Sequence, residues 1–218
     1  MKRIIIAIGL ALLAALATFA QGTFLFSGNS KSVWDNYSTS LPHISGETLT
    51  VAFLFGTGTP KIAQIGSSVA TNAEWNMYIT STAWSDILGD PNYTLATSGG
   101  TNIQASVITS YGAWIGNGNS SYLVTGSTGG ATYTVYVIAW DSAYATPAAA
   151  QAADAAVGWS APFTYFTGNP NAQPPTSPQA FNTSVIPFGV LLPIPEPSTL
   201  ALAGVGIASL FVFRDRRK

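Results

Sequence analysis

Residues 131–140, ATYTVYVIAW, restrict the fold of this chain more than any other segment. As an extended strand, the segment places large side chains on both faces, because successive side chains of a strand point to opposite sides. One face carries Tyr133, Val135 and Val137, and the other carries Tyr136, Ile138 and Trp140. Bulk on both faces is typical of a strand that is covered on both sides. We therefore expect a central strand between two layers of packing.

Five further segments have the composition of β-strands. They are rich in Val, Ile, Thr, Tyr and Trp, which fit a pleated surface, and turns rich in Gly and Asn separate several of them. These segments are residues 48–55, 102–109, 110–115, 122–125 and 159–167. The sequence thus predicts an all-β domain, of the β-sandwich or jelly-roll type, over residues 21–168. We call this the passenger domain.

One short Ala-rich helix is expected within the passenger domain. Thr146 has the character of an N-cap, and Pro147 suits the first helical position. A run rich in Ala follows, and we expect Gly158 to end the helix. A shorter helical turn is predicted at residues 83–88.

The charge balance excludes several classes of protein. The chain is 47% hydrophobic and 8% charged, so it lacks the high charge and low hydrophobicity of disordered chains. Residues 21–195 hold seven acids against two bases, a net charge of −5, which argues against nucleic acid as a partner. Because the chain has no Cys, a disulfide framework and a Cys-based zinc site are excluded.

Residues 1–20 have the three parts of a secretory signal peptide. Lys2 and Arg3 form a basic start, an apolar stretch covers residues 4–17, and small residues precede a cleavage site ahead of Gln21. The sequence therefore predicts export through the general secretion machinery. An uncleaved anchor helix is the alternative.

A second apolar segment, residues 198–213, contains no charged residue. As a helix it would be about 24 Å long at ~1.5 Å per residue, which is short for a hydrocarbon core of ~30 Å. A basic tail, residues 214–218, follows it and contains Arg214, Arg216, Arg217 and Lys218. Such a cluster favours the cytoplasmic side of a membrane. We expect a transmembrane helix at 198–213, with the passenger domain outside and the tail in the cytoplasm.

The tripeptide Pro195-Glu196-Pro197 directly precedes this apolar segment. Residues 195–218 resemble the PEP-CTERM sorting signal, which combines a Pro-Glu-Pro tripeptide, a short apolar helix and an Arg-rich end. The resemblance implies that exosortase, an intramembrane transpeptidase-like enzyme, recognises Pro195, Glu196 and Pro197 and removes the helix. It also implies a Gram-negative bacterium that makes extracellular polysaccharide. A plain tail anchor is the alternative.

Residues 169–194 are rich in Pro, a composition that favours an extended spacer. We expect this linker to hold the passenger domain away from the membrane. Docking of residues 190–192 on the domain is left open.

Signals for a metal site or for catalysis are sparse. His43 is the only His, so a His cluster is excluded, and no cofactor is expected. Asp86, Asp90 and Asn92 form the best oxygen-ligand group but lack a complete calcium-loop motif. A glycosidase-like pair of carboxylates is formally available. Its candidates are Asp35, Glu47, Glu74, Asp86, Asp141 and Asp154.

Six Trp and nine Tyr are the one unusual feature of the composition. Exposed aromatic rings can stack on sugars, whereas buried rings would fill a β core. Trp114, beside a loop rich in Asn and Gly, is the preferred exposed candidate, and Trp34 and Trp84 are weaker ones.

The sequence is best interpreted as an exported, non-enzymatic protein of the cell surface or the exopolysaccharide matrix, anchored in the inner membrane until it is processed. A carbohydrate-binding module that contacts exopolysaccharide is one alternative, and a secreted glycoside hydrolase is another.

Overall fold

The structure is a computed structural model that describes residues 21–29, 32–35, 48–61, 81–108 and 112–190, apart from the side chains of residues 34, 35 and 81–83. The predicted signal peptide, the predicted transmembrane helix and the basic tail therefore lie outside the described residues. Within the described ranges, no helix has the length and apolar character needed to cross a membrane.

Two long antiparallel strands form the centre of the fold. Strand β4 (Leu49–Gly56) pairs with β11 (Thr132–Asp141) along nearly its whole length, so that Val137 lies opposite Phe53 and Asp141 opposite Leu49. Residues 135–140 of β11 are all buried. The expectation of a central strand covered on both faces is therefore confirmed.

Six further strands extend this pair into an eight-stranded curled sheet whose main path has the order β12-β11-β4-β8-β9-β2. In it, β8 (Ala105–Ile108) and β9 (Ala113–Ile115) lead to β2 (Ser27–Gly28), while β13 (Phe163–Phe166) pairs with β11 and β5 (Tyr93–Leu95) with β4. The structure confirms the mostly β class. Eight of the described strands join in this curled sheet, and three further pairs, β1 with β10, β3 with β14 and β6 with β7, form separate two-stranded sheets. The β-sandwich or jelly-roll type therefore stays a prediction.

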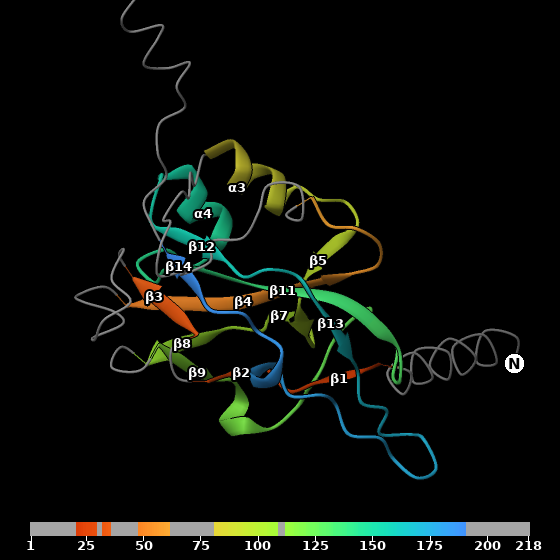
Figure 1. Ribbon diagram of the computed structural model, residues 1–218. Helices are drawn as coiled ribbons and strands as arrows, with labels where there is room; N and C mark the ends of the chain where they lie inside the picture. The colour runs from red at the N-terminus through yellow and green to blue at the C-terminus, as the bar shows by residue number, and fades with distance from the viewer. Residues whose placement is uncertain (1–20, 30–31, 36–47, 62–80, 109–111, 191–218) are drawn as a thin grey trace, which may run out of the picture.

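Short elements complete the layer that faces the β4–β11 pair. They are β1 (Thr23–Phe24), which pairs with β10 (Tyr122–Leu123), the hairpin of β6 (Thr97–Ser98) with β7 (Thr101–Asn102), and a 3₁₀ turn at Asn117–Asn119. Figure 1 shows β8, β9 and β2 on one side of the β4–β11 pair and the two helices on the other. The β4–β11 pair is thus covered by strands on one face and by the two helices on the other.

Each face of the pair contributes to its own hydrophobic core. On one face Val135, Val137 and Phe53 pack with rings of the opposite layer, including Phe24 and Trp114. On the other face a second cluster lies under the helices, and it contains Leu54, Tyr136, Ile138, Trp140, Trp84 and Trp159. The strict alternation along β11 therefore separates two cores with one strand.

Two helices are described. Helix α3 (Ser81–Leu88) includes the helical turn predicted at residues 83–88, which is confirmed. Helix α4 (Pro147–Ala152) begins as predicted, because the Thr146 side chain accepts a hydrogen bond from the Ala149 N–H and Pro147 occupies the first turn. Figure 1 places α3 and α4 side by side, and the amide of Gln151 bonds to the Ser85 hydroxyl at 2.7 Å.

The predicted end of α4 at Gly158 is wrong. The helix ends at Ala152, and Asp154 adopts a positive φ of 49°, which turns the chain back. Gly158 lies instead in strand β12 (Val157–Trp159), which pairs with β11. The helix does not continue to Gly158 because Val157 and Trp159 are buried in the core under the helices when they form a strand. The free energy of this burial outweighs the helix propensity of the Ala-rich segment.

The predicted spacer is also wrong for residues 169–190. A 3₁₀ turn at Phe181–Thr183 buries Phe181 completely, and strand β14 (Phe188–Val190) pairs in parallel with β3 (Val33–Asp35). Phe188 is fully buried and Val190 is 3% exposed. The domain boundary expected at residue 168 therefore cuts through the packed core, and the docking of residue 190, left open above, is observed.

Candidate functional site

The residues of the predicted sorting signal, Pro195, Glu196 and Pro197, lie outside the described residues, as do the basic residues 214–218. What the structure shows is the element that leads into them. Strand β14 ends at Val190, directly before this region. We therefore describe its surroundings first, then the places where the sequence indicated a glycan, a metal or a pair of catalytic acids.

Strand β14 is held on two sides. Phe188, Gly189 and Val190 pair with Val33, Trp34 and Asp35, and the Phe188 N–H donates to the Ser32 carbonyl at 3.0 Å. On its other side, β14 lies against β12, where the backbone of Gly189 approaches Gly158. The strand is therefore an integral part of the fold. The apolar residues at 181, 185, 188 and 190 were the sequence signal for this packing, but the surrounding prolines favoured a spacer.

The preferred glycan contact, Trp114, is fully buried, and so is Trp84. The expectation that Trp114 is exposed beside its loop is therefore wrong. Trp140 is also fully buried and Trp159 is 2% exposed, while Trp84 stacks on Trp159 with ring centroids 5.9 Å apart. Trp34 lies in β3 but its side chain is outside the described part, and Trp75 lies outside the described residues.

The burial of Trp114 follows from its position in β9. Ala113 and Ile115 point to the outside of the sheet, so that Trp114 between them points inward. Gly28 lies directly opposite Trp114 in β2, and a Cβ on Gly28 would overlap the indole ring. The bulk of Trp114 is thus accommodated by the absence of a side chain on the partner strand. Its neighbour Ile115, 55% exposed, occupies the outer surface instead.

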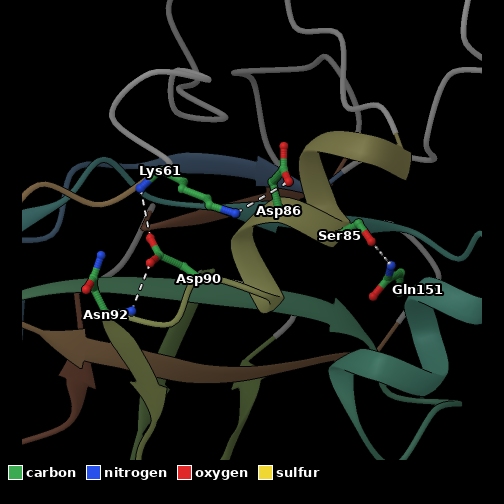
Figure 2. Close-up of polar contacts among 6 residues, drawn as sticks. All are labelled: Lys61, Ser85, Asp86, Asp90, Asn92 and Gln151. Carbon is green, nitrogen blue, oxygen red and sulfur yellow. Dashed lines mark hydrogen bonds and ion pairs between the residues drawn. The ribbon is translucent and has the colours of Figure 1, made fainter.

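The acids weighed for calcium form a structural cluster around Asp90, shown in Figure 2. Asp90 is 3% exposed, and its two carboxylate oxygens accept hydrogen bonds from the backbone N–H groups of Lys61 at 2.9 Å and Asn92 at 3.0 Å. The ammonium of Lys61 lies 3.7 Å from the carboxylate of Asp86 on α3. Asp90 therefore joins the 57–61 loop to the turn before β5.

This cluster lacks the features of a metal or catalytic centre. Both oxygens of Asp90 are used by backbone donors, and Asp86 is half-exposed beside Lys61. In the described ranges, no three His, Cys, Asp or Glu side chains are grouped closely enough to hold a metal ion. Calcium binding by Asp86, Asp90 and Asn92 therefore gains no support from the geometry.

The other candidate acids do not form a described pair either. Asp141 ends β11 and accepts a hydrogen bond from the Ala143 N–H in a turn, and Asp154 is exposed after α4. Glu47, Glu74 and His43 lie outside the described residues, and Asp35 is described without its side chain. A glycosidase-like arrangement thus stays a prediction that no described pair of carboxylates supports.

A cleft of about 310 Å³ opens between the helices and the sheet, and sequence reasoning did not identify it. Its lining includes Leu54, Leu88, Tyr93, Leu95, Asn102 and Pro147, and none of its lining residues is charged. The Tyr93 hydroxyl donates to the Gly58 carbonyl at 2.8 Å, and burial raises the pKa of Tyr93. The cleft therefore presents a mostly apolar surface in which Tyr93, Asn102 and Thr146 are the polar side chains.

The comparisons with known proteins identify one region of the chain. Residues 193–218 match the family model of the PEP-CTERM protein-sorting motif, which confirms the resemblance found in the sequence. The match includes Pro195, Glu196 and Pro197 together with the apolar segment and the basic tail. Comparison with curated proteins and comparison with solved structures each gave no match.

Proposed function

We propose that this chain is an exported, non-enzymatic protein of the cell surface or extracellular matrix, and that exosortase processes it near Pro195-Glu196-Pro197. The observation that carries the proposal is the PEP-CTERM motif at residues 193–218. In this motif the tripeptide is the recognition element, the apolar segment 198–213 is the transient membrane anchor, and the basic tail keeps the C-terminus in the cytoplasm.

The start of the packed domain supports cleavage of the signal peptide ahead of Gln21. The Gly22 N–H donates to the Ser127 hydroxyl at 3.0 Å, and Phe24 is fully buried among aromatic rings. A cut ahead of Gln21 therefore leaves every described packing residue in the product. The chain then crosses the inner membrane through the general secretion machinery, with the passenger domain on the outer side.

The proposal assigns no catalysis to the passenger domain. The buried carboxylate Asp90 is engaged by backbone donors, and the apolar cleft has no charged residue in its lining. The passenger domain is the part of the product that would meet extracellular polysaccharide. Because Trp84 and Trp114 lie in the core, such a contact has to use Trp34, whose side chain is outside the described part, or side chains other than these tryptophans.

The test is C-terminal peptide mapping, by mass spectrometry, of the protein from its native host. We expect a new C-terminus near Pro195 and the absence of residues 198–213 from the recovered product. A variant with Pro195→Ala, Glu196→Ala and Pro197→Ala should keep the full chain in the membrane fraction. Pro187→Ala is the matched control, since it changes a proline before β14 and leaves the tripeptide intact.

Two results would contradict the proposal. If the unaltered chain ends at Lys218 and stays in the membrane fraction, then the apolar segment is a permanent anchor. If the tripeptide variant is processed as fast as the control, then Pro195, Glu196 and Pro197 are not the recognition element.

A further inference from the structure

The packed domain ends very close to the sorting tripeptide. Val190 is 3% exposed in β14, and four residues, 191–194, separate it from Pro195. A chain advances at most ~3.6 Å per residue when fully extended, so Pro195 lies no more than about 18 Å from Val190. This bound follows from covalent geometry alone.

We call residues 191–194 the tether. The point at which the tether begins, Val190, is held in place by the fold. Strand β14 pairs with β3, and Phe188 and Val190 belong to the larger hydrophobic core. Gly189 also packs on Gly158 of β12 so closely that a side chain on Gly158 would overlap its carbonyl oxygen. Releasing β14 would therefore expose two core side chains and remove its strand pairing. In the folded protein, residues 191–194 are the only residues between β14 and the tripeptide.

The passenger domain is large compared with this tether. A compact domain of about 170 residues has a radius of gyration of roughly 15 Å, so its width exceeds the maximum tether length. An enzyme that binds Pro195-Glu196-Pro197 next to the membrane must therefore lie against the folded domain. The end of the domain that carries β14 is the part that faces it.

Strand register identifies this end of the domain. Val190 contacts Gly158, and Gly158 lies opposite Ala139, two residues before β11 ends at Asp141. The first residue of β11, Thr132, is seven residues from Ala139, or roughly 23 Å along the strand. Figure 1 shows β3, β12 and β14 together, away from β13, which pairs with the start of β11. Val33 of β3 and all three residues of β14 are buried there, whereas Ala143 and Ala145, just after the end of β11, are exposed. We name the surface at this end of the domain, which includes Ala143 and Ala145, the exit face.

We propose that the exit face is an interaction surface for the membrane-embedded enzyme that processes the sorting signal. This inference rests on the proposed function, because it requires that the tripeptide be bound at the membrane. The folded domain then presents the tripeptide within about 18 Å of Val190, and contact between the enzyme and the exit face accompanies each processing event.

The charges of the described residues favour a protein partner over lipid headgroups. Lys61 is the one basic residue of the described ranges, and its ammonium is 3.7 Å from Asp86 on α3. The acids Asp141 and Asp154 lie beside the end of β11 and the start of β12. Anionic headgroups attract clusters of Lys and Arg, which the described exit face does not supply.

Crosslinking from single cysteines tests the proposal, since the chain contains no Cys of its own. Ala143→Cys places a thiol two residues beyond the end of β11, and Thr132→Cys places one at its start, roughly 30 Å away. Both positions are exposed. Each full-length variant is labelled with a thiol-reactive benzophenone and photolysed in membranes that contain epitope-tagged exosortase. We expect several-fold more adduct with the tagged enzyme from Ala143→Cys than from Thr132→Cys.

A spacer variant provides the second measurement. Insertion of about twelve Gly and Ser residues between Leu192 and Pro193 adds a flexible segment with a reach of about 20 Å. In this variant the adduct from Ala143→Cys should fall to the level of Thr132→Cys. Equal adducts from the two positions, an adduct unaffected by the spacer, or adducts with lipid alone would each overturn the proposal.

Processing of the unaltered chain is followed in the same membranes. If residues 198–213 are not removed there, the proposed function fails. If they are removed but the two cysteines crosslink alike, only the exit face is overturned. The two failures are therefore distinguishable.

Discussion

Gly158 of β12 and Gly189 of β14 meet backbone to backbone. A Cβ on Gly158 would overlap the carbonyl oxygen of Gly189 and would also contact Cα of Val190. The two strands belong to segments that are 31 residues apart in the chain, and their close approach fixes the last described strand against the central sheet. The absence of a side chain at residue 158 is therefore a condition for the packing of the C-terminal part of the domain.

We expect Gly158→Ala to destabilise the domain by about 1–3 kcal/mol, the usual cost of overpacking a close-packed site. The new methyl group meets backbone atoms, which cannot rotate away as a flexible side chain would. Denaturant unfolding of the exported protein measures the change. Gly89→Ala is the matched control, because its Cβ would meet one atom, the Ser85 carbonyl oxygen, at 3.1 Å. Equal stability of the two variants would show that β14 does not pack on β12.

Phe181→Ala tests whether residues 169–190 are part of the passenger domain. The Phe181 ring is fully buried and lies 4.7 Å from that of Tyr165 and 5.0 Å from that of Phe53. Truncation should cost about 3–5 kcal/mol, as is typical for a buried Phe. Ile186→Ala, in the same segment but 45% exposed, should cost much less. A negligible effect of Phe181→Ala on the unfolding midpoint would restore the spacer interpretation.

Two buried tyrosines should respond in opposite ways to loss of the hydroxyl. Tyr165 accepts a hydrogen bond from the Leu25 N–H at 2.9 Å and donates to the Gln179 carbonyl at 2.5 Å. Tyr165→Phe therefore leaves two backbone groups unpaired and should cost about 1–3 kcal/mol. The buried Tyr136 hydroxyl has no partner in the described structure, so Tyr136→Phe should be neutral or stabilising. Comparable losses in both variants, measured by urea unfolding, would contradict this assignment.

The same tyrosines predict a loss of stability at alkaline pH. Burial raises the pKa of both Tyr136 and Tyr165 above the ordinary value of 10.0, and the negative charge of Asp90 adds to the effect on Tyr136. In the unfolded chain, phenols release protons near pH 10, whereas in the folded protein these two keep them. The folded state then binds more protons, so the free energy of unfolding falls as the pH rises above about 10.

This pH dependence is measured as the denaturant midpoint between pH 8 and pH 11.5. We expect little contribution from the two tyrosines below pH 9 and a decline above pH 10. Tyr136→Phe should make the decline shallower, since one of the two buried phenols is gone. A decline of unchanged steepness in Tyr136→Phe would assign the alkaline transition to other groups.

Asp90 and Asp86 should differ sharply in their importance for stability. Asp90→Ala removes the acceptor of two backbone N–H groups from a buried position, and we expect a loss of about 1.5–3 kcal/mol. Asp86→Ala removes a half-exposed ion pair with Lys61, which is worth roughly 0–1 kcal/mol. Both losses are measured by denaturant unfolding with and without calcium. A calcium-dependent midpoint that disappears in Asp90→Ala would show that the cluster binds the metal.

The pattern of residues 131–140 was sufficient to predict the central strand. Both faces of this strand carry large side chains, and each face packs in a hydrophobic core of its own. The start of α4 was likewise predictable, since Thr146 and Pro147 act through local hydrogen bonding and backbone geometry. The burial of Trp114 was not predictable, because it depends on which residue lies opposite in β2, and that register is set by packing between distant segments.

Features that act through local chemistry can be read from the amino-acid sequence: the mostly β composition, the N-cap of α4, and the tripeptide, apolar segment and basic tail of the sorting motif. Where the domain ends follows from contacts between distant segments. Prolines in residues 169–190 indicate an extended chain, but an extended chain can pair as well as span, and Phe181, Phe188 and Val190 gain burial by returning to the sheet. That return depends on Val33, more than 150 residues earlier in the chain, which no local pattern specifies.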